Sequence, residues 1–478
     1  MKQLRRSMRI VAFFLVLMLL LPIGYGAYSL IRYGTRWKTS EYNVYLRNMK
    51  NEVTAGDILD RNGVTLATTI VSYDIDGEVK RTRQYAQDAA VRKAVVHVVG
   101  DSKNTVKNAA ESFLAEYLYG ANMNYVEHLT QLMKSGQLRG DDVTLTIDSA
   151  LSAYIASVFP SGYSGAVVVM NYKTGEIYAE LSFPNYDPLL TPSVSVYQAL
   201  NRATRWLSAP GSTFKVVTLA SALQNMPDAT TRTFTCTGGV IFGEHERNVM
   251  DYGMTAHGTV NLKSAFTQSC NSTFAVLAAE LGDKALRRTA AGFGVGDDFT
   301  FRDLVVENSA FANTDSALMG ADLAWTGAGQ NELALTPLHM CMIASAVAND
   351  GVMMEPRILL QATGTTGTQR VQFEPIVYRT AMTPEVAATV RSYMRSVVTN
   401  GTGRSAGVEG LTICGKTGTA EIDTQEKDNA WFVGYALNDD CPLAFACVVE
   451  DAGFGNTYAR PVVEAALETA TNNLRGKM

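Results

Sequence analysis

An uncharged apolar run sets the N-terminal part of the chain apart from the remainder. Residues 10–31 contain no charged side chain, and four basic residues precede them: Lys2, Arg5, Arg6 and Arg9. A helix of this length can cross a bilayer, and cations on its N-terminal flank favour a cytoplasmic N-terminus. We therefore predict a cytoplasmic segment over residues 1–9 and a transmembrane anchor over residues 10–31.

A cleaved signal peptide is the alternative interpretation of this run. Its densest apolar core, residues 10–21, is short, and Gly24-Tyr25-Gly26 resembles a small-x-small cleavage site. Both interpretations place the rest of the chain outside the cytoplasm.

Strand-like and helix-like patterns then alternate along the rest of the chain. Apolar runs predict two early strands, over residues 165–170 and 177–181, with Gly175 as the turn residue between them. Three late strands are predicted over residues 412–421, 430–437 and 442–450, and residues 462–473 predict a closing helix. With helical stretches between the two groups, the pattern indicates an α+β domain with a mostly antiparallel five-stranded sheet flanked by helices.

The segment from about residue 40 to residue 140 mixes polar helical and hairpin patterns and predicts a small separate domain. Residues 103–133 have a helical pattern, and Asn62-Gly63 predicts a hairpin turn. The length of 478 residues, with 47% hydrophobic and 18% charged residues, agrees with more than one globular domain.

Charge is distributed unevenly along the chain. Residues 1–40 carry seven basic side chains and no acidic one, so the total of −5 leaves −12 for the remainder. An acidic exported part is unsuited to nucleic-acid binding.

Cysteine and histidine positions predict neither a cofactor nor a metal site. Six cysteines are scattered at positions 236, 270, 341, 414, 441 and 447 without a Cys-x-x-Cys spacing, and the five histidines are isolated. Export permits disulfides, but the spacing selects no pairing.

The segment Ser212-Thr213-Phe214-Lys215 carries the candidate chemistry. A serine hydroxyl needs a base to become a nucleophile, and a lysine three residues later on a helix lies on the same face. Burial or a nearby cation can lower the pKa of that lysine enough for it to act as the base. Pro210-Gly211 predicts that Ser212 lies at a helix N-terminus, where free N–H groups favour negative charge.

Two further motifs follow in order along the chain. They are Ser269-Cys270-Asn271 and Lys416-Thr417-Gly418-Thr419, and the ordered trio is typical of penicillin-binding proteins and class A β-lactamases. Earlier copies, Ser102-Lys103-Asn104 and Lys173-Thr174-Gly175, precede the serine and have the wrong order. We interpret Cys270 as a small buried residue rather than a second nucleophile.

Further segments resemble those of class B penicillin-binding proteins, which are membrane-anchored, monofunctional peptidoglycan D,D-transpeptidases. They are residues 165–176, Phe183-Pro184-Asn185-Tyr186-Asp187-Pro188, Asn201-Arg202-Ala203, Gly329-Gln330, Leu335-Thr336-Pro337-Leu338 and residues 430–435. Residues 56–63 resemble the family's pedestal motif, and residues 141–148 resemble the start of its catalytic domain. Ala55 and Asn429 depart from the arginine and histidine that the family often has. The resemblance implies a pedestal over residues 32–140 and a transpeptidase domain over residues 141–478.

The resemblance also implies a role for each motif residue. Ser212 would attack the carbonyl of the penultimate D-Ala of a stem peptide, and Lys215 would accept its proton. Ser269 would relay a proton to the leaving D-Ala, and Asn271 would orient Lys215 and hold the donor amide. Lys416, Thr417, Gly418 and Thr419 would bind the terminal carboxylate of the substrate or of a β-lactam. The backbone N–H groups of Ser212 and Thr419 would form an oxyanion hole.

The resemblance leaves three other activities open. A class A β-lactamase would need a Glu-x-x-Leu-Asn segment, and the nearest match after Ser269, at Glu332, is followed by Thr336 instead of asparagine. A D,D-carboxypeptidase would differ only in using water as the acceptor. A β-lactam sensor would need a cytoplasmic output domain, but at most nine residues precede the predicted span.

No glycan polymerase is expected within this chain. Its only Glu-Asp pair, Glu450-Asp451, follows the catalytic motifs. The family resemblance therefore implies a separate membrane glycan polymerase of the FtsW/RodA kind as partner. The expected ligands of the chain itself are peptidoglycan stem peptides on lipid II-derived glycan, and β-lactam antibiotics.

Overall fold

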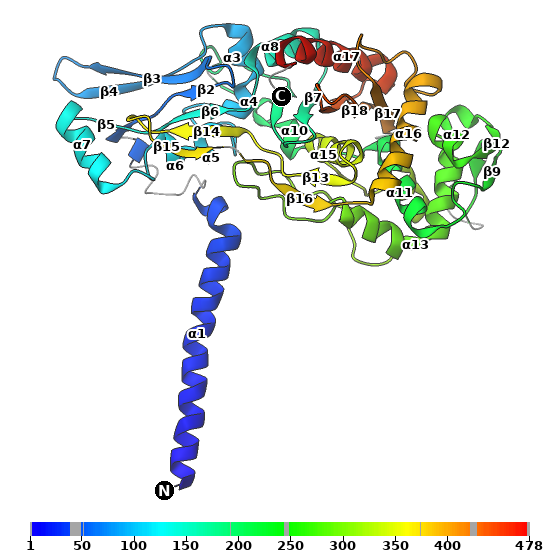
Figure 1. Cartoon of the computed structure of the whole chain (residues 1–478), viewed down its shortest axis with the longest axis horizontal. Helices are drawn as coiled ribbons and strands as arrows, with labels where there is room; N and C mark the ends of the chain where they lie inside the picture. The colour runs from blue at the N-terminus through cyan, green and yellow to red at the C-terminus, as the bar shows by residue number, and fades with distance from the viewer. Residues whose placement is uncertain are drawn as a thin grey trace.

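The computed structural model describes residues 2–38, 49–50, 52–191, 193–242, 248–372, 374–420 and 428–475. Helix α1 (Lys2–Lys38) stands apart from the folded remainder of the chain (Figure 1). Within α1, the most apolar 18-residue stretch of residues 5–30 has a mean hydropathy of 2.4. No residue of that stretch is buried in the structure. This helix is long and apolar enough to cross a membrane, as the uncharged run predicts.

A five-stranded antiparallel sheet forms the centre of the C-terminal part, with the strand order β17-β18-β19-β7-β8. Its strands are β7 (Gly165–Asn171), β8 (Ile177–Phe183), β17 (Ile413–Ala420), β18 (Asn429–Ala436) and β19 (Leu443–Val449). All five agree with the predicted strands to within one or two residues. The tight turn at Gly175, with φ of +80°, joins β7 to β8.

Helices cover both faces of this sheet, so its strands are buried along almost their whole length rather than at alternate positions. One face packs against α8 (Ser149–Val158) and α17 (Gly455–Leu474), and the other packs against α15 (Pro337–Ala348). Every residue of α15 is buried. An all-round apolar helix of this kind belongs in a core. Helix α16 (Pro384–Asn400) packs against α15 and the β17 edge of the sheet, and α11 (Lys215–Asn225) packs against α16.

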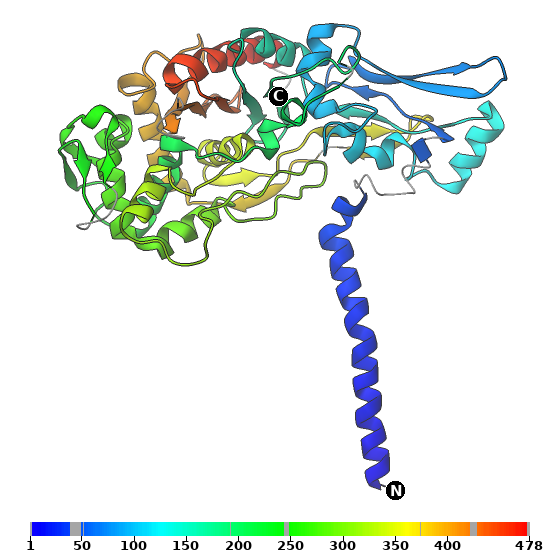
Figure 2. The same cartoon turned by 180° about the vertical axis from the view of Figure 1, so that it is seen from behind.

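A helical part extends beyond the β17 edge of the sheet. It contains α12 (Leu262–Thr267), α13 (Asn271–Gly292) and α14 (Gly320–Ala328). Short strand pairs lie beside these helices: β9 (Thr233–Cys236) with β12 (Gly258–Asn261), and β10 (Gly239–Val240) with β11 (Val249–Met250). In both views this green region lies at the opposite end of the folded part from the N-terminal sheet (Figures 1 and 2).

The N-terminal sheet has six strands in the order β15-β14-β6-β2-β3-β4. The strands are β2 (Ile58–Leu59), β3 (Thr65–Tyr73), β4 (Val79–Tyr85), β6 (Asp142–Leu145), β14 (Leu359–Thr363) and β15 (Gln369–Gln372). The hairpin predicted at Asn62-Gly63 joins β2 to β3, and Gly63 has φ of +82°. Because β14 and β15 come from the C-terminal part, this sheet contains strands from both sides of the predicted domain boundary between residues 140 and 141. The position of this domain boundary remains a prediction.

The predicted helical run over residues 103–133 is broken into short pieces. They are α5 (Ala110–Phe113), α6 (Ala115–Leu118) and α7 (Tyr125–Ser135). Gly120, with φ of +66°, turns the chain after α6, and Asn124 starts α7 with a capping box to Glu127. A helical pattern does not reveal such a break, because a left-handed turn and a new cap cost little locally. The remaining short elements of this part are α3 (Ala89–Ala94), α4 (Val96–Val99), β1 (Val53–Thr54) and β5 (Leu138–Arg139).

Candidate active site

Ser212 lies in a short 3-10 turn, η1 (Gly211–Phe214), which leads directly into α11. Its position at the start of the helix agrees with the prediction from Pro210-Gly211. Gly211 has φ of +56°, and a Cβ there would lie 2.8 Å from the carbonyl oxygen of Thr419. Only glycine fits both the backbone conformation and this close approach to β17. The turn therefore holds Ser212 against the strand that carries the third motif.

Lys215 is the first residue of α11 and is fully buried. Its Nζ lies 3.0 Å from Ser212 Oγ, 2.8 Å from the carbonyl oxygen of Ser269 and 2.5 Å from Asn271 Oδ1. Ser269 Oγ lies 3.4 Å from the same nitrogen. The amine is therefore within proton-transfer reach of the candidate nucleophile and of the hydroxyl of the second motif.

The second motif is a tight turn between α12 and α13. Ser269 has φ of +61°, a conformation that non-glycine residues seldom adopt and that is found at functional sites. Cys270 is the N-cap of α13, and Asn271 is its first residue. Asn271 is held on both sides, because its Nδ2 donates to the carbonyl of Met250 at 2.8 Å and its backbone N–H donates to Asp251 at 2.5 Å.

Lys416 reaches the same point from strand β17 and is also fully buried. Its Nζ donates to Ser269 Oγ at 2.9 Å and to the carbonyl of Thr417 at 3.0 Å. The Ser269 hydroxyl thus lies between the two lysines. Gly418 leaves room for the nucleophile turn, since a Cβ on it would lie 2.9 Å from Thr213 Cγ2 and 3.0 Å from the carbonyl of Pro210.

Burial controls the charge of both lysines. It lowers the pKa of Lys215 to about 8, against smaller opposing effects from Cys270 and Asp251. Burial, followed by repulsion from Lys215, holds the pKa of Lys416 well below its ordinary value. About a tenth of Lys215 is then neutral at pH 7, so the amine can accept a proton without an external base.

A groove of about 280 Å³ runs over these residues. Ser212, Ser269, Asn271, Thr417 and Thr419 line it, together with Gln330 and Thr402. Thr417 and Thr402 share a hydroxyl–hydroxyl hydrogen bond of 2.6 Å. The aromatic rings of Tyr252 and Phe454 meet at 5.2 Å, edge to face, and also line the groove.

The penicillin binding protein transpeptidase domain matches residues 165–468. The peptidoglycan D,D-transpeptidase PbpA of Mycolicibacterium smegmatis is 30% identical over 86% of this chain and 89% of its own length. This chain belongs to the class B penicillin-binding proteins.

Solved structures of two other bacterial proteins agree with this family assignment. The penicillin G acyl-enzyme complex of penicillin-binding protein A from M. tuberculosis superposes with a TM-score of 0.77 at 27% identity, over 88% of this chain and 100% of that one. The D,D-transpeptidase domain of a peptidoglycan glycosyltransferase from Eggerthella lenta gives a TM-score of 0.72 at 29% identity, over 89% of this chain and 100% of that one. The expected transpeptidase fold is thereby confirmed.

The family signatures outside the three motifs support this penicillin-binding protein's active site from behind. Gly329, at the end of α14 with φ of +100°, packs so closely on Gly211 that a Cβ would lie 1.8 Å from its carbonyl oxygen. Arg202 is buried and pairs with Glu450 at 2.6 Å. Asn429, which departs from the family pattern, donates to Ser208 Oγ at 3.1 Å and accepts the backbone N–H of Asp451 at 3.1 Å.

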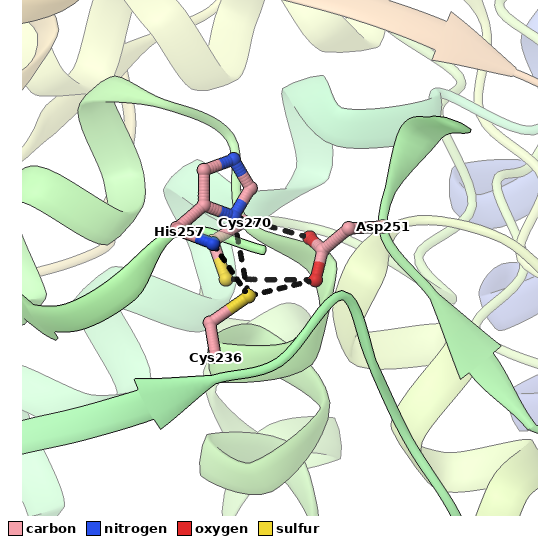
Figure 3. Close-up of side chains that lie close together, drawn as sticks. All are labelled: Cys236, Asp251, His257 and Cys270. Atoms are coloured by element: carbon pink, nitrogen blue, oxygen red, sulfur yellow. Dashed lines mark hydrogen bonds and ion pairs between the residues drawn. The ribbon is translucent and has the colours of Figure 1, made fainter. Parts of the chain in front are cut away.

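The tertiary structure brings to the site several residues that no motif in the sequence marks. Asp251 supports Asn271 and also accepts the hydroxyl of Ser272. Asp251, Cys236 and His257 lie beside Cys270, so that four potential metal ligands meet although no metal motif is visible in the sequence (Figure 3). Cys270 itself is buried and is not among the described residues that line the groove, in agreement with its interpretation as a small buried side chain. No sequence signal marks Asp251, because its partners lie up to 21 residues away.

Proposed function

We propose that this penicillin-binding protein cross-links peptidoglycan stem peptides through an acyl-enzyme on Ser212. The observation that carries the proposal is the position of the Lys215 amine, 3.0 Å from Ser212 Oγ and beside the Ser269 hydroxyl, which Lys416 also contacts. Nucleophile, base and proton relay are then in contact before substrate binds.

Acylation would proceed from this arrangement in two proton transfers. Neutral Lys215 accepts the Ser212 proton as Oγ forms a bond to the carbonyl carbon of the penultimate D-Ala. The tetrahedral oxyanion is stabilised by the backbone N–H groups of Ser212 and Thr419, each such donor contributing about 3–4 kcal/mol. As the C–N bond breaks, the Ser269 hydroxyl passes a proton to the leaving D-Ala amine and regains one from Lys215.

Lys416, Thr417, Gly418 and Thr419 would bind the terminal carboxylate of the donor. A carboxylate close to Lys416 favours its protonated form, so substrate binding restores the charge that burial suppresses. A positive Lys416 in turn disfavours protonation of Lys215. Substrate binding and activation of the base are then linked through these two lysines.

The fate of the acyl-enzyme distinguishes a transpeptidase from a β-lactamase. Asp251 is the carboxylate among the described residues that line the groove. Its oxygens are occupied by Asn271 N–H, by the Ser272 hydroxyl and by Cys236 Sγ at 3.2 Å. Such a carboxylate is poorly placed to activate a deacylating water, and an amine acceptor deprotonated by Lys215 would resolve the ester instead.

We expect the penicilloyl adduct on Ser212 to persist for many minutes or longer. Intact-protein mass after penicillin removal would show a single adduct that maps to the Ser212 peptide. With lipid-linked pentapeptide and a partner polymerase, cross-linked dimers should form and should disappear when penicillin is added. Rapid multiple-turnover hydrolysis of penicillin would contradict the proposal in favour of a β-lactamase, and trimmed peptides without cross-links would indicate a carboxypeptidase.

We further propose that α1 anchors the protein in the cell membrane by a single span, with the catalytic part outside the cytoplasm. The apolar window of α1 and the basic residues before it support this topology. Full-length protein should fractionate with membranes and keep its N-terminus, and external protease should cut only beyond about residue 33. A mature protein that starts near Ala27 would show a signal peptide instead.

A separate glycan polymerase of the FtsW/RodA kind is the partner we propose. Glu450, the glutamate of the Glu-Asp pair, is paired with the buried Arg202, which argues against a role in glycan polymerisation. The chain would therefore cross-link strands that another membrane protein makes.

A further inference from the structure

Helix α7 (Tyr125–Ser135) presents an apolar face to the solvent, and none of its residues is buried. The exposed apolar residues recur at spacings of three, four and seven positions, so they share one side of the helix. They are Tyr125, Val126, Leu129, Leu132 and Met133, and the exposed fraction reaches 77% for Tyr125 and 86% for Met133. A surface helix normally turns such a face towards the core. The orientation of α7 is therefore the reverse of the usual one.

Polar contacts on the opposite side of α7 hold the helix in this orientation. The carboxylate of Glu127 accepts two hydrogen bonds from Arg370 of strand β15, at 2.7 and 3.1 Å. Gln131 Nε2 donates to Thr365 Oγ1 at 2.9 Å, and Gln131 Oε1 accepts the backbone N–H of Arg139 at 2.9 Å. Turning α7 to bury its apolar face would break all of these contacts. The apolar face is therefore fixed outwards and needs an apolar neighbour from outside the folded part.

The connection of the chain places α7 close to the end of the predicted membrane span. Ten residues, 39–48, lie between α1 and Met49, which packs against the core, and such a connection reaches at most about 40 Å. Strand β1 follows soon after Met49 and pairs with β5, the strand directly after α7, with Val53 opposite Leu138. Figures 1 and 2 show α7 in the half of the folded part next to the end of α1, on the side towards α1. An α1 that spans the bilayer therefore keeps α7 near the outer membrane surface.

The charge near α7 also suits a lipid surface. Residues 119–139 contain two basic side chains and one acidic one, a net charge of +1, although the chain as a whole is acidic. Three basic residues follow the apolar run of α1 in the sequence: Arg32, Arg36 and Lys38. Basic residues beside an apolar helix face favour contact with anionic lipid headgroups. A tyrosine at the end of that face is typical of the boundary between membrane and water.

We propose that the apolar face of α7 lies in the outer surface of the lipid bilayer and forms a second membrane contact besides α1. The inference rests on the proposed anchoring by α1. The five apolar side chains would enter the boundary between headgroups and acyl chains, while Glu127 and Gln131 keep their contacts with the protein. A single span leaves the folded part free to tilt and to rotate. Contact at α7 would fix the orientation of the active-site groove relative to the membrane.

A fluorescent probe attached to Leu129→Cys tests this contact. The full chain is placed singly in nanodiscs of phosphatidylethanolamine and phosphatidylglycerol, without other proteins. The six native cysteines are buried, so brief labelling modifies the introduced thiol. We expect a blue-shifted emission that is quenched by lipids with a nitroxide on the acyl chain near the headgroup. Tyr154→Cys is the matched control, because Tyr154 and Leu129 are both 43% exposed and α8 lies on the side away from α1 (Figure 1). Its probe should stay unquenched.

Three results would overturn the proposal, and they differ in what they assign. A Leu129 probe that is quenched no more than the Tyr154 probe, in chains that have entered the nanodiscs, would refute the contact at α7 alone. Chains that do not enter nanodiscs would contradict the anchoring by α1 and this contact with it. Shielding of the Leu129 probe that appears only when a glycan polymerase or a second copy of the chain is added would assign the face to a protein partner instead of lipid.

A double substitution of the apolar face provides a second test, with the probe on Val126→Cys. Leu129→Gln combined with Met133→Gln should abolish the quenching, because the amides favour water over the acyl-chain boundary. Thermal unfolding should change little, since both side chains are exposed. Leu190→Gln combined with Val196→Gln changes two exposed apolar residues of the catalytic part and should keep the quenching. Quenching that persists in the α7 double variant would contradict a role of the apolar face.

The orienting role is tested by comparing two reactions of the same α7 double variant. Penicillin acylation should proceed at the wild-type rate, because no residue of α7 is among the described residues that line the groove. Cross-linking of lipid-linked pentapeptide by the chain and a partner polymerase in vesicles should fall severalfold, because the groove would lose its fixed orientation. Cross-linking at the wild-type rate in a variant that has lost the quenching would refute the orienting role. Slowed acylation would show that the substitutions disturb the active site itself and would also refute it.

Discussion

Ser212→Ala is expected to abolish covalent labelling by penicillin while the protein stays folded. The hydroxyl is the group that would form the ester, whereas its loss removes a single hydrogen bond of 3.0 Å to Lys215. Such a bond contributes about 0.5–1.5 kcal/mol to stability, so thermal unfolding should change little. Gel labelling with a fluorescent penicillin, wild type beside variant, measures the effect.

Ser221→Ala is the matched control for this experiment. Ser221 is a buried serine of the same helix α11, and its hydroxyl contacts Ala285 rather than the groove. It should label like the wild type. Undiminished labelling of folded Ser212→Ala would mean that another residue is the nucleophile.

Lys215→Ala should slow acylation by roughly 10²–10⁴-fold, the usual contribution of a general base. In the wild type the rate should rise with pH and level off above the pKa of Lys215, about 8, because only the neutral amine accepts the serine proton. The expected profile therefore has an acid limb centred near that pH. Stopped-flow acylation between about pH 6 and about pH 10 would show the limb in the wild type and its absence in the variant.

An exposed lysine provides the control for the loss of a positive charge. Lys284 lies on the surface of α13, and Lys284→Ala should keep both the rate and the acid limb. Removing Lys215 leaves Asn271 and the carbonyl of Ser269 without their buried partner, so thermal unfolding of the variant must be recorded alongside. An acid limb that persists in Lys215→Ala would assign the titration to a different group.

The local pattern of hydrophobic and polar residues predicted those helices and strands whose formation depends on burial alone. Strands β7, β18 and β19 of the central sheet are buried on both faces and therefore appear in the sequence as largely apolar runs. Such runs fix the bounds of these strands to within one or two residues. The uncharged run of the N-terminal helix and the ordered trio of motifs were equally visible, because each is contained in a few consecutive residues.

Interruptions of a helix that cost little free energy locally could not be recognised in the sequence. The helical pattern over residues 103–133 conceals the left-handed turn at Gly120 and the cap at Asn124. Strands β14 and β15 complete a sheet whose other members lie before residue 146. The pairing of β14 with β6 depends on which strand of the N-terminal sheet has an unpaired edge. An unpaired edge exists only once the other strands have assembled.

By itself, therefore, the sequence determined the family and predicted the nucleophile and the residue types of the active site, but it did not reveal their electrostatics. Lys416 and Ser269 are 147 residues apart in the chain and in contact in space. Burial in the tertiary structure lowers the pKa values of both Lys215 and Lys416. Asp251 and the Cys236–His257 contact likewise depend on the pairing of short strands. Burial, dielectric environment and ligand geometry arise from packing between distant segments, which local patterns of hydrophobic and polar residues do not encode.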